Sequence, residues 1–284
     1  MPSPPAVPLI SMSTPSRSEP LGPADTAARG DWVRARLQYA LEHDGLSVVY
    51  QPEIDVRDGR VTAVEALARW HDDELGPVSP QEFIAVAEGC QLIIPLGRMM
   101  FSRVLADLPA LTERWPQIRV AVNFSLRELA EPDFQEWLHK RLSGTAARWR
   151  QHLELEVTET LFQQVTPALQ LAMQSLRQMG LTLAIDDFGT GHSSLARLHT
   201  LPFDKIKLDR SFVQALDNPM VQAIIGAMAG LAVMFSRSLV VEGVETQQQL
   251  EHLARLGCRT VQGYLLSAPA PLEQLLARAT SQQP

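Results

Sequence analysis

Apolar and polar residues alternate along the chain in two different periods, one typical of helices and one typical of strands. A helical period begins at Asp31, whose side chain is placed to cap the first turn. Two strand-like runs follow at residues 46–56 and 61–70, and Asp58-Gly59 between them is a favoured hairpin turn. The pattern therefore predicts a helix followed by two antiparallel strands.

Beyond residue 78, helical and strand periods alternate as far as the last residues of the chain. The first predicted helix of this part begins at Ser79. The later ones cover residues 95–115, 132–149, 167–179, 194–199, 218–236, 246–256 and 271–279. The predicted strands cover residues 118–124, 153–157, 181–185, 205–208, 239–241 and 260–262. This alternation predicts an α/β protein, built either as a closed (β/α)8 TIM-like barrel or as an open doubly wound sheet.

A polar residue stands at or near the end of almost every predicted strand, usually after apolar positions. These residues are Glu65, Asn123, Glu156, Asp186, Asp187, Lys207, Glu242 and Gln262. In a barrel the strand ends converge on one mouth, where active sites of this fold lie, whereas an open sheet spreads them along an edge. The pattern therefore favours the barrel and gathers these side chains into one cluster. Asn123 follows Val120 and Val122, so we expect it to be buried and to need a partner, which a metal ion supplies.

The predicted cluster is rich in oxygen donors, and no His or Cys is placed with it. Carboxylate and amide oxygens suit Mg²⁺ or Mn²⁺ and argue against zinc. The carboxylates exceed what one ion needs, so the pattern favours two ions bridged by an aspartate, with Asp186 as the bridge. Two such ions activate a water and stabilise an in-line displacement at phosphorus, and Lys207 would lie beside the nucleophile. The cluster therefore predicts phosphodiester hydrolysis.

Single members of the cluster have simpler interpretations, which the residues alone leave open. Asp186 and Asp187 stand before two glycines and are compatible with a solvated turn. Glu65 is compatible with an ion pair to Arg69 inside a barrel, and Lys207 with a solvated strand end. Only the whole set favours a metal site over these alternatives.

Length and composition bound the number of domains. The chain has 284 residues, of which 45% are hydrophobic, enough to form one barrel-sized domain or two small ones. Residues 1–30 are rich in Pro, Ser and Ala and have few positions that pack, which predicts a disordered leader or the remnant of a linker. Residues 31–284 then form the folded domain.

Charge and cysteine content limit the partners and the compartment. The formal net charge is −7 and basic residues are scattered, so the sequence argues against binding a nucleic-acid polymer. Cys90 and Cys258 exclude a disulfide framework and favour a reducing cytoplasm. The longest apolar run, residues 224–235, is too short to span a membrane, and the first residues do not resemble a secretory signal.

Eight short motifs together resemble one known family. Glu65-Ala66-Leu67, within EALARW, is similar to the signature of the EAL-domain phosphodiesterases, which hydrolyse the bacterial second messenger cyclic di-GMP. The other motifs are YQP (50–52), VNFS (122–125), ELEVTE (154–159), DDFGTGHSS (186–194), KIKLDRSF (205–212), EGVET (242–246) and QGY (262–264). The resemblance runs from about Asp31 to the C-terminus, and the ordered set is far more specific than any three-letter match. His192 and Cys90-Gln91 depart from the residues common in the family.

The resemblance implies a barrel whose first strand runs antiparallel to the others, and a site that binds two Mg²⁺ or Mn²⁺ ions. The residues that would hold the first ion are Glu65, Asn123, Glu156 and Asp186. Asp186 and Asp187 would engage the second ion. Lys207 and Glu242 would position and deprotonate the attacking water, with Glu242 as the general base.

The same resemblance implies which residues meet the substrate, cyclic di-GMP. Gln51 and Arg69 would contact its base and phosphate, and the residues that would line the pocket are Asp209, Glu245 and Gln262. Glu159 would brace the glycine loop by a hydrogen bond. The expected product is the linear dinucleotide pGpG.

Two other functions are compatible with parts of the sequence. A catalytically silent receptor for cyclic di-GMP or a protein partner is known in this family, but such members usually lack a metal carboxylate, and none is missing here. A Mg²⁺ barrel enzyme acting on carboxylic acids fits the ligands but does not explain the eight motifs. No GGDEF motif or recognisable sensory domain precedes Asp31. Control is therefore expected through a homodimer formed near the glycine loop and the helix after it, a separate regulatory protein, or a domain trimmed from the chain.

Overall fold

The computed structural model describes residues 23–130, 133–159, 166–189 and 201–281. Within these residues nine strands form one sheet, in the order β1-β9-β8-β7-β6-β5-β4-β2-β3, and a further pairing of β1 with β2 closes it. The strands are β1 (Leu46–Asp55), β2 (Val61–Asp72), β3 (Gly76–Val78), β4 (Arg119–Asn123), β5 (Leu153–Thr158), β6 (Thr182–Phe188), β7 (Lys205–Leu208), β8 (Ser238–Val241) and β9 (Thr260–Val261).

Eight of these strands make a closed barrel, and β3 extends β2 outside it. β1 pairs antiparallel with both β2 and β9, whereas the pairs from β2 through β4 to β9 are parallel. The barrel, its α/β class and its antiparallel first strand are therefore confirmed, and the open doubly wound sheet is excluded.

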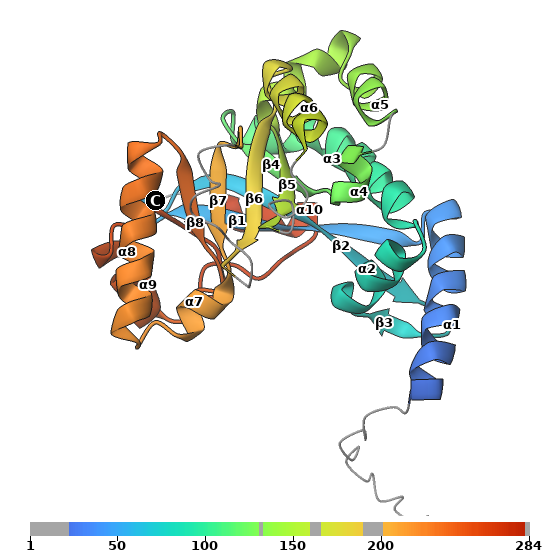
Figure 1. Cartoon of the computed structure of the whole chain (residues 1–284), viewed down its shortest axis with the longest axis horizontal. Helices are drawn as coiled ribbons and strands as arrows, with labels where there is room; N and C mark the ends of the chain where they lie inside the picture. The colour runs from blue at the N-terminus through green and yellow to red at the C-terminus, as the bar shows by residue number, and fades with distance from the viewer. Residues whose placement is uncertain (1–22, 131–132, 160–165, 190–200, 282–284) are drawn as a thin grey trace, which may run out of the picture.

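The helices surround the barrel, as Figure 1 shows, with α1, α2 and β3 grouped on one side and α8 and α9 on the opposite side. Their bounds are α1 (Pro23–Glu42), α2 (Pro80–Gly89), α3 (Ile93–Arg114), α4 (Leu126–Ala130), α5 (Phe134–Arg141), α6 (Pro167–Gln178), α7 (Arg210–Gln214), α8 (Pro219–Met234), α9 (Gln247–Arg255) and α10 (Leu272–Ser281). A 3-10 helix, η1, covers Gly144–His152. Ser79, Thr166, Asn218 and Thr246 cap the helices that follow them through side-chain oxygens.

The barrel strands separate two kinds of interior because successive side chains of a strand point to opposite faces. In β5, Leu153 and Leu155 face the surrounding helices. Glu154 and Glu156, which alternate with them, face the inside of the barrel, where both are fully buried. β7 repeats this pattern with Lys205 and Lys207 facing inward. The apolar core therefore lies between the barrel and the helices, while the barrel interior itself is charged.

The structure corrects several predicted element boundaries. α1 begins at Pro23 and runs through Gly30 and Asp31, so Asp31 is not its cap and the last part of the predicted leader is helical. Arg29 on this helix donates to Glu82 of α2, a long-range contact that the local pattern could not indicate. The rest of the leader and the predicted helix 194–199 lie outside the described residues.

Three further elements were not predicted or took another form. The short β3 pairs with the end of β2, and α7 begins directly after β7. The segment predicted to be helical over 132–149 divides into α5 and the 3-10 helix η1. None of the helices in the described ranges combines the length and the apolar character that crossing a membrane requires.

Candidate active site

The end of β6 turns two adjacent carboxylates toward the same mouth of the barrel. In a regular strand Asp186 and Asp187 would point to opposite faces. The pairing of β6 with β7 shifts register between Ile185 and Phe188, and Asp187 has a positive φ of 54°. Such an irregularity redirects a side chain, and a left-handed non-glycine residue is typical of a functional site. Asp186 and Asp187 can therefore both reach the centre of the mouth.

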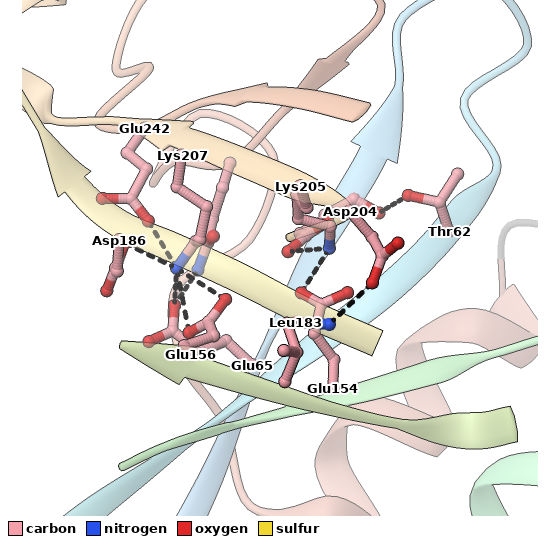
Figure 2. A network of polar contacts seen from close by, with 12 residues as sticks. Thr62, Glu65, Glu154, Glu156, Leu183, Asp186, Asp204, Lys205, Lys207 and Glu242 are labelled. Atoms are coloured by element: carbon pink, nitrogen blue, oxygen red, sulfur yellow. Dashed lines mark hydrogen bonds and ion pairs between the residues drawn. The ribbon is translucent and has the colours of Figure 1, made fainter. Parts of the chain in front are cut away.

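Lys207 lies at the centre of the cluster and contacts four carboxylates (Figure 2). Its Nζ lies 2.7 Å from Glu242 Oε1, 3.0 Å from Glu65 Oε2, 3.1 Å from Glu156 Oε1 and 3.3 Å from Asp186 Oδ1. The lysine is fully buried, and Glu156 is too. Carboxylates from segments that are far apart in the sequence therefore meet at one ammonium group, as the barrel prediction requires, although Glu65 lies within β2 and not at its end.

Side-chain amides fix the orientation of Glu65. Gln262 Nε2 donates to Glu65 Oε2 over 2.9 Å, and Asn123 Nδ2 donates to Glu65 Oε1 over 2.8 Å. Gln262 Nε2 also lies 3.3 Å from Gln51 Oε1, which joins β1 to the same network. The expectation that Asn123 is buried was wrong, because the residue is exposed at the strand end. Its partner within the described residues is a carboxylate of the cluster.

Two groups of carboxylates have the spacing that a metal ion needs. Glu65, Glu156 and Asp186 each offer one oxygen, all within 4.8 Å of one another, and so do Asp186, Asp187 and Glu242. Asp186 belongs to both groups. All the donors in these two groups are carboxylate oxygens, which suit hard divalent cations such as Mg²⁺ and Mn²⁺. The geometry therefore offers two neighbouring cation positions with one shared carboxylate.

Burial makes it unfavourable for most of these carboxyls to be charged. It raises the pKa of Glu156 well above its usual value and also raises that of Asp186. Burial, with the neighbouring charge of Asp186, raises the pKa of Asp187 to about 6. The pKa of Glu242 rises to about 8, again mainly through burial. The cluster therefore needs cations or protons to offset its negative charge.

Glu65 and Lys207 behave differently because each has strong partners. Burial opposes ionisation of Glu65, but the charge of Lys207 and the amide hydrogen bonds outweigh it, so the pKa of Glu65 is lowered. Burial likewise opposes charging of Lys207, but the surrounding carboxylates raise its pKa well above the usual value. The metal-free arrangement therefore favours the charged form of Lys207, which makes it a poor proton acceptor.

A cavity of about 840 Å³ adjoins the carboxylate cluster. Its lining includes Asn123, Asp186 and Asp187 of the mouth, and also Arg69 and Glu88. It has the size of a small-molecule site, and its wall also includes apolar residues of α2 and α3. The cavity therefore brings Arg69 to the same space as the cluster.

The remaining candidate residues are a buried glutamate, an aspartate that caps a helix and an exposed glutamate. Glu159 is buried, and its Oε2 accepts a hydrogen bond from the backbone N–H of Gly189 over 2.9 Å, as expected for support of the glycine loop. Asp209 caps α7 by accepting from Ser211 N, and its charge acts on Asp187. Glu245 is exposed, and in the described part of the chain no contact joins its side chain to the cluster.

The profile of the EAL domain matches residues 34–269, most of the described chain. The chain belongs to the EAL domain family. Its closed barrel and the mouth described above agree with that membership.

Relatives and solved structures extend the match. The cyclic di-GMP phosphodiesterase PA2567 of Pseudomonas aeruginosa is 38% identical over 82% of this chain and 40% of its own length. NbdA of the same organism, also named a cyclic di-GMP phosphodiesterase, is 40% identical over 86% of this chain and 31% of its own length. The PaMucR phosphodiesterase in complex with c-di-GMP superposes with a TM-score of 0.80 at 34% identity, covering 86% of this chain and 99% of that one. The chain thus spans about a third of the length of these two curated relatives.

The EAL barrel also contains buried charges that the sequence reading did not single out. Lys205, Glu53 and Glu154 form a second group inside the barrel, which we call the lower layer; the Lys207 cluster is the upper layer (Figure 2). A signal was present, because Glu154 and Glu156, like Lys205 and Lys207, are two residues apart on one strand and must share a face.

Glu128 is another buried carboxyl that the sequence reading missed. Its Oε2 accepts from Ser125 N, and Ser125 Oγ accepts from Glu128 N, which is the capping-box pattern at the start of α4. A side chain at Gly97 would collide with this carboxyl, since a Cβ there would lie 1.9 Å from Glu128 Oε1. The Ser-x-x-Glu spacing in residues 125–128 was the signal that could have found it.

Proposed function

We propose that this EAL domain hydrolyses cyclic di-GMP to linear pGpG by two-metal-ion phosphodiester cleavage. The observation that carries the proposal is the shared position of Asp186 in two adjacent groups of carboxylate oxygens. A single cation site would not need five carboxylates, and a structural ion pair would not need an excess of them over Lys207. Relatives named as cyclic di-GMP phosphodiesterases support the choice of substrate.

The residues present fit Mg²⁺ or Mn²⁺. Glu65, Glu156 and Asp186, with Asn123, would hold one ion, and Asp186 with Asp187 would hold the other. When bound, the ions would lower the pKa of a water and offset the negative charge that develops at phosphorus. Asn123 would present its amide oxygen, which requires its amide to turn away from Glu65.

Lys207 and Glu242 would act on the attacking water. Glu242 Oε1 lies 2.7 Å from Lys207 Nζ, so both groups would contact the same bound water. Burial raises the pKa of Glu242, so its carboxylate, once ionised, is a stronger base than an exposed one. Lys207 remains charged and would orient the water and stabilise the anion that forms. Glu242 is therefore the proposed general base and Lys207 the positioning cation.

The 840 Å³ cavity would receive the substrate. Arg69 lines this cavity and offers a guanidinium for a phosphate or base. Gln51, held by its donation to Ser267 O, would contact a base. Asp209, Glu245 and Gln262 are not among the described residues that line this cavity, and they would line the part of the substrate pocket that extends beyond it. Glu159 would hold the start of the glycine loop at Gly189.

The proposal is tested by incubating the purified chain with cyclic di-GMP and Mg²⁺ or Mn²⁺ and separating the nucleotides by chromatography. We expect pGpG to accumulate and a chelator to stop the reaction. An absence of hydrolysis with metal present would contradict the proposal. Binding of cyclic di-GMP without hydrolysis would instead favour the silent receptor.

A homodimer is also proposed for this domain. The interface expected near the glycine loop includes the predicted helix 194–199, which lies outside the described residues. A different apolar surface that a second copy would cover is formed by exposed residues of α8 and its C-cap, namely Met220, Ile224, Met234 and Phe235. Light scattering with and without cyclic di-GMP and metal would test this. A strictly monomeric, active protein would contradict it.

A further inference from the structure

The lower layer repeats the design of the upper layer with fewer carboxylates. Lys205 Nζ lies 2.8 Å from Glu53 Oε2, 3.0 Å from Glu53 Oε1 and 2.6 Å from Glu154 Oε1. The three residues are only 4%, 1% and 0% exposed in the order Lys205, Glu53 and Glu154. One ammonium therefore offsets part of the negative charge of two carboxylates in the middle of the barrel, where burying a charge is costly.

The two carboxylates on Lys205, together with Glu156 of the upper layer, have the spacing of a cation site. Glu53, Glu154 and Glu156 each offer a carboxylate oxygen, and these oxygens lie within 4.8 Å of one another. Glu156 also belongs to the upper group with Glu65 and Asp186. A cation bound in the lower layer would therefore compete for a carboxylate that the mouth needs.

The lower layer also lies beside a second cavity. This cavity, of about 620 Å³, lies at the end of the barrel where the strands begin, and its lining includes Arg119, Thr182, Lys205 and Ser238. Lys205 is thus a member of both the cavity wall and the buried charge group. The lower layer therefore adjoins open space at the end of the barrel opposite the mouth.

We propose that the Lys205 ammonium is a fixed internal cation that occupies the place of a metal ion in the lower layer and confines divalent cations to the mouth. Lys205 is therefore a positioning residue, because it acts through Glu156 and does not contact the reacting atoms. The inference rests on the proposed function, since it assumes that the upper layer binds metal ions.

The test is a calorimetric titration of the full metal-free chain with Mn²⁺ at pH 8. Lys205→Ala removes the ammonium and leaves room for an ion, whereas Lys205→Met removes the charge but fills the space. We expect Lys205→Ala to bind one more Mn²⁺ per chain than the unaltered protein, and Lys205→Met to bind no additional ion. An equal count for Lys205→Ala and the unaltered protein would overturn the proposal.

A neutral variant keeps the proposal testable if Lys205→Ala does not fold. Glu53→Gln, Glu154→Gln and Lys205→Met together remove every charge of the lower layer. We expect this triple variant to fold and to bind as many Mn²⁺ ions as the unaltered protein, with affinity within about threefold. A triple variant that fails to fold, or that folds and loses ions, would contradict a role limited to charge.

Failure of this inference and failure of the proposed function give different results. If the unaltered chain binds Mn²⁺ and Lys205→Ala binds the same number, only the role of Lys205 is wrong. If the unaltered chain binds no Mn²⁺, the two-metal function is wrong and the inference fails with it.

Discussion

The upper and lower layers of the barrel interior are built on the same strands but differ in their balance of charge. In the upper layer Lys207 contacts four carboxylates, whereas in the lower layer Lys205 contacts two. Both lysines are almost completely buried. Burial and an ion pair alone therefore do not distinguish a structural group from a metal site. The two layers differ in how many carboxylates share one ammonium, which is four at Lys207 and two at Lys205.

That difference has a physical cost. An uncompensated buried charge costs several kcal/mol, so an excess of carboxylates persists only where protons or cations offset it. The raised pKa values of Glu156, Asp186 and Glu242 express this cost in the metal-free protein. The upper layer is thus poised to exchange protons for metal ions, while the lower layer already contains its cation.

The largest predicted effect is a loss of hydrolysis. It is tested by two substitutions on β5, one in the upper layer and one in the lower layer. Glu156→Gln removes a proposed metal ligand, and we expect cyclic di-GMP hydrolysis to fall by roughly 10³-fold. Glu154→Gln lies two residues away, is equally buried, and leaves Lys205 paired with Glu53, so we expect activity to change by less than about tenfold. Initial rates at saturating Mn²⁺ measure both. Equal losses in the two variants would remove the distinction between the layers.

A smaller effect is expected from Glu242→Gln, which keeps the shape of the side chain but removes the proposed base. Turnover should fall about 10²-fold or more, while the affinity for cyclic di-GMP should change little. Single-turnover rates and equilibrium binding, measured with the same metal, separate the two quantities. A loss of binding as large as the loss of rate would count against the assignment of Glu242 as base.

The pH dependence of metal binding sharpens the comparison further. Burial raises the pKa of Asp187 to about 6 and also raises the pKa values of Asp186 and Glu156, so these proposed ligands still hold protons at pH 6 that a metal ion must displace. Mn²⁺ affinity should therefore increase by about tenfold or more from pH 6 to pH 8, and Glu154→Gln should leave this slope unchanged. Calorimetry at both pH values checks the prediction, and a flat profile would contradict it.

The smallest predicted effect concerns Glu128, a buried carboxyl outside both layers. Burial raises its pKa to about 8, although the Ser125 hydrogen bonds and the charge of Arg98 oppose the shift. The folded protein then keeps a proton that the unfolded chain releases above its lower pKa, so stability falls as pH increases from about 4.5 to 8. Glu128→Gln should be more stable than the unaltered protein at pH 8 by about 1 to 2 kcal/mol, and this advantage should shrink at pH 5.

Urea unfolding at the two pH values measures this effect. Glu113→Gln, an exposed change on α3, is the matched control and should show no such trend. An advantage of Glu128→Gln that does not grow with pH would show that this carboxyl does not titrate as its burial requires.

The sequence predicted the barrel and most of the upper layer for a clear physical reason. Glu65, Glu156, Lys207 and Glu242 each follow apolar strand residues, and the strand ends of a barrel converge. The three glutamates therefore lie close to Lys207 for two reasons: the alternation of apolar and polar residues along each strand, and the closure of the sheet into a barrel.

Other features depend on contacts that local patterns do not contain. Asp187 reaches the mouth because β6 shifts register against β7, which no residue pattern specified. Glu53 of β1 meets Lys205 of β7 inside the closed barrel, although the two residues are 152 positions apart in the sequence. α1 extends to Pro23 through a Gly that helical propensity disfavours, and its Arg29 contacts Glu82 of α2. In each case tertiary contacts decided the outcome.

The number of Mn²⁺ ions bound at the mouth tests the central claim most directly. Calorimetric titration of the metal-free, unaltered chain at pH 8 counts them without relying on turnover. Two ions per chain are predicted, because Asp186 belongs to two adjacent groups of carboxylate oxygens. A count of one or none would contradict the two-metal account.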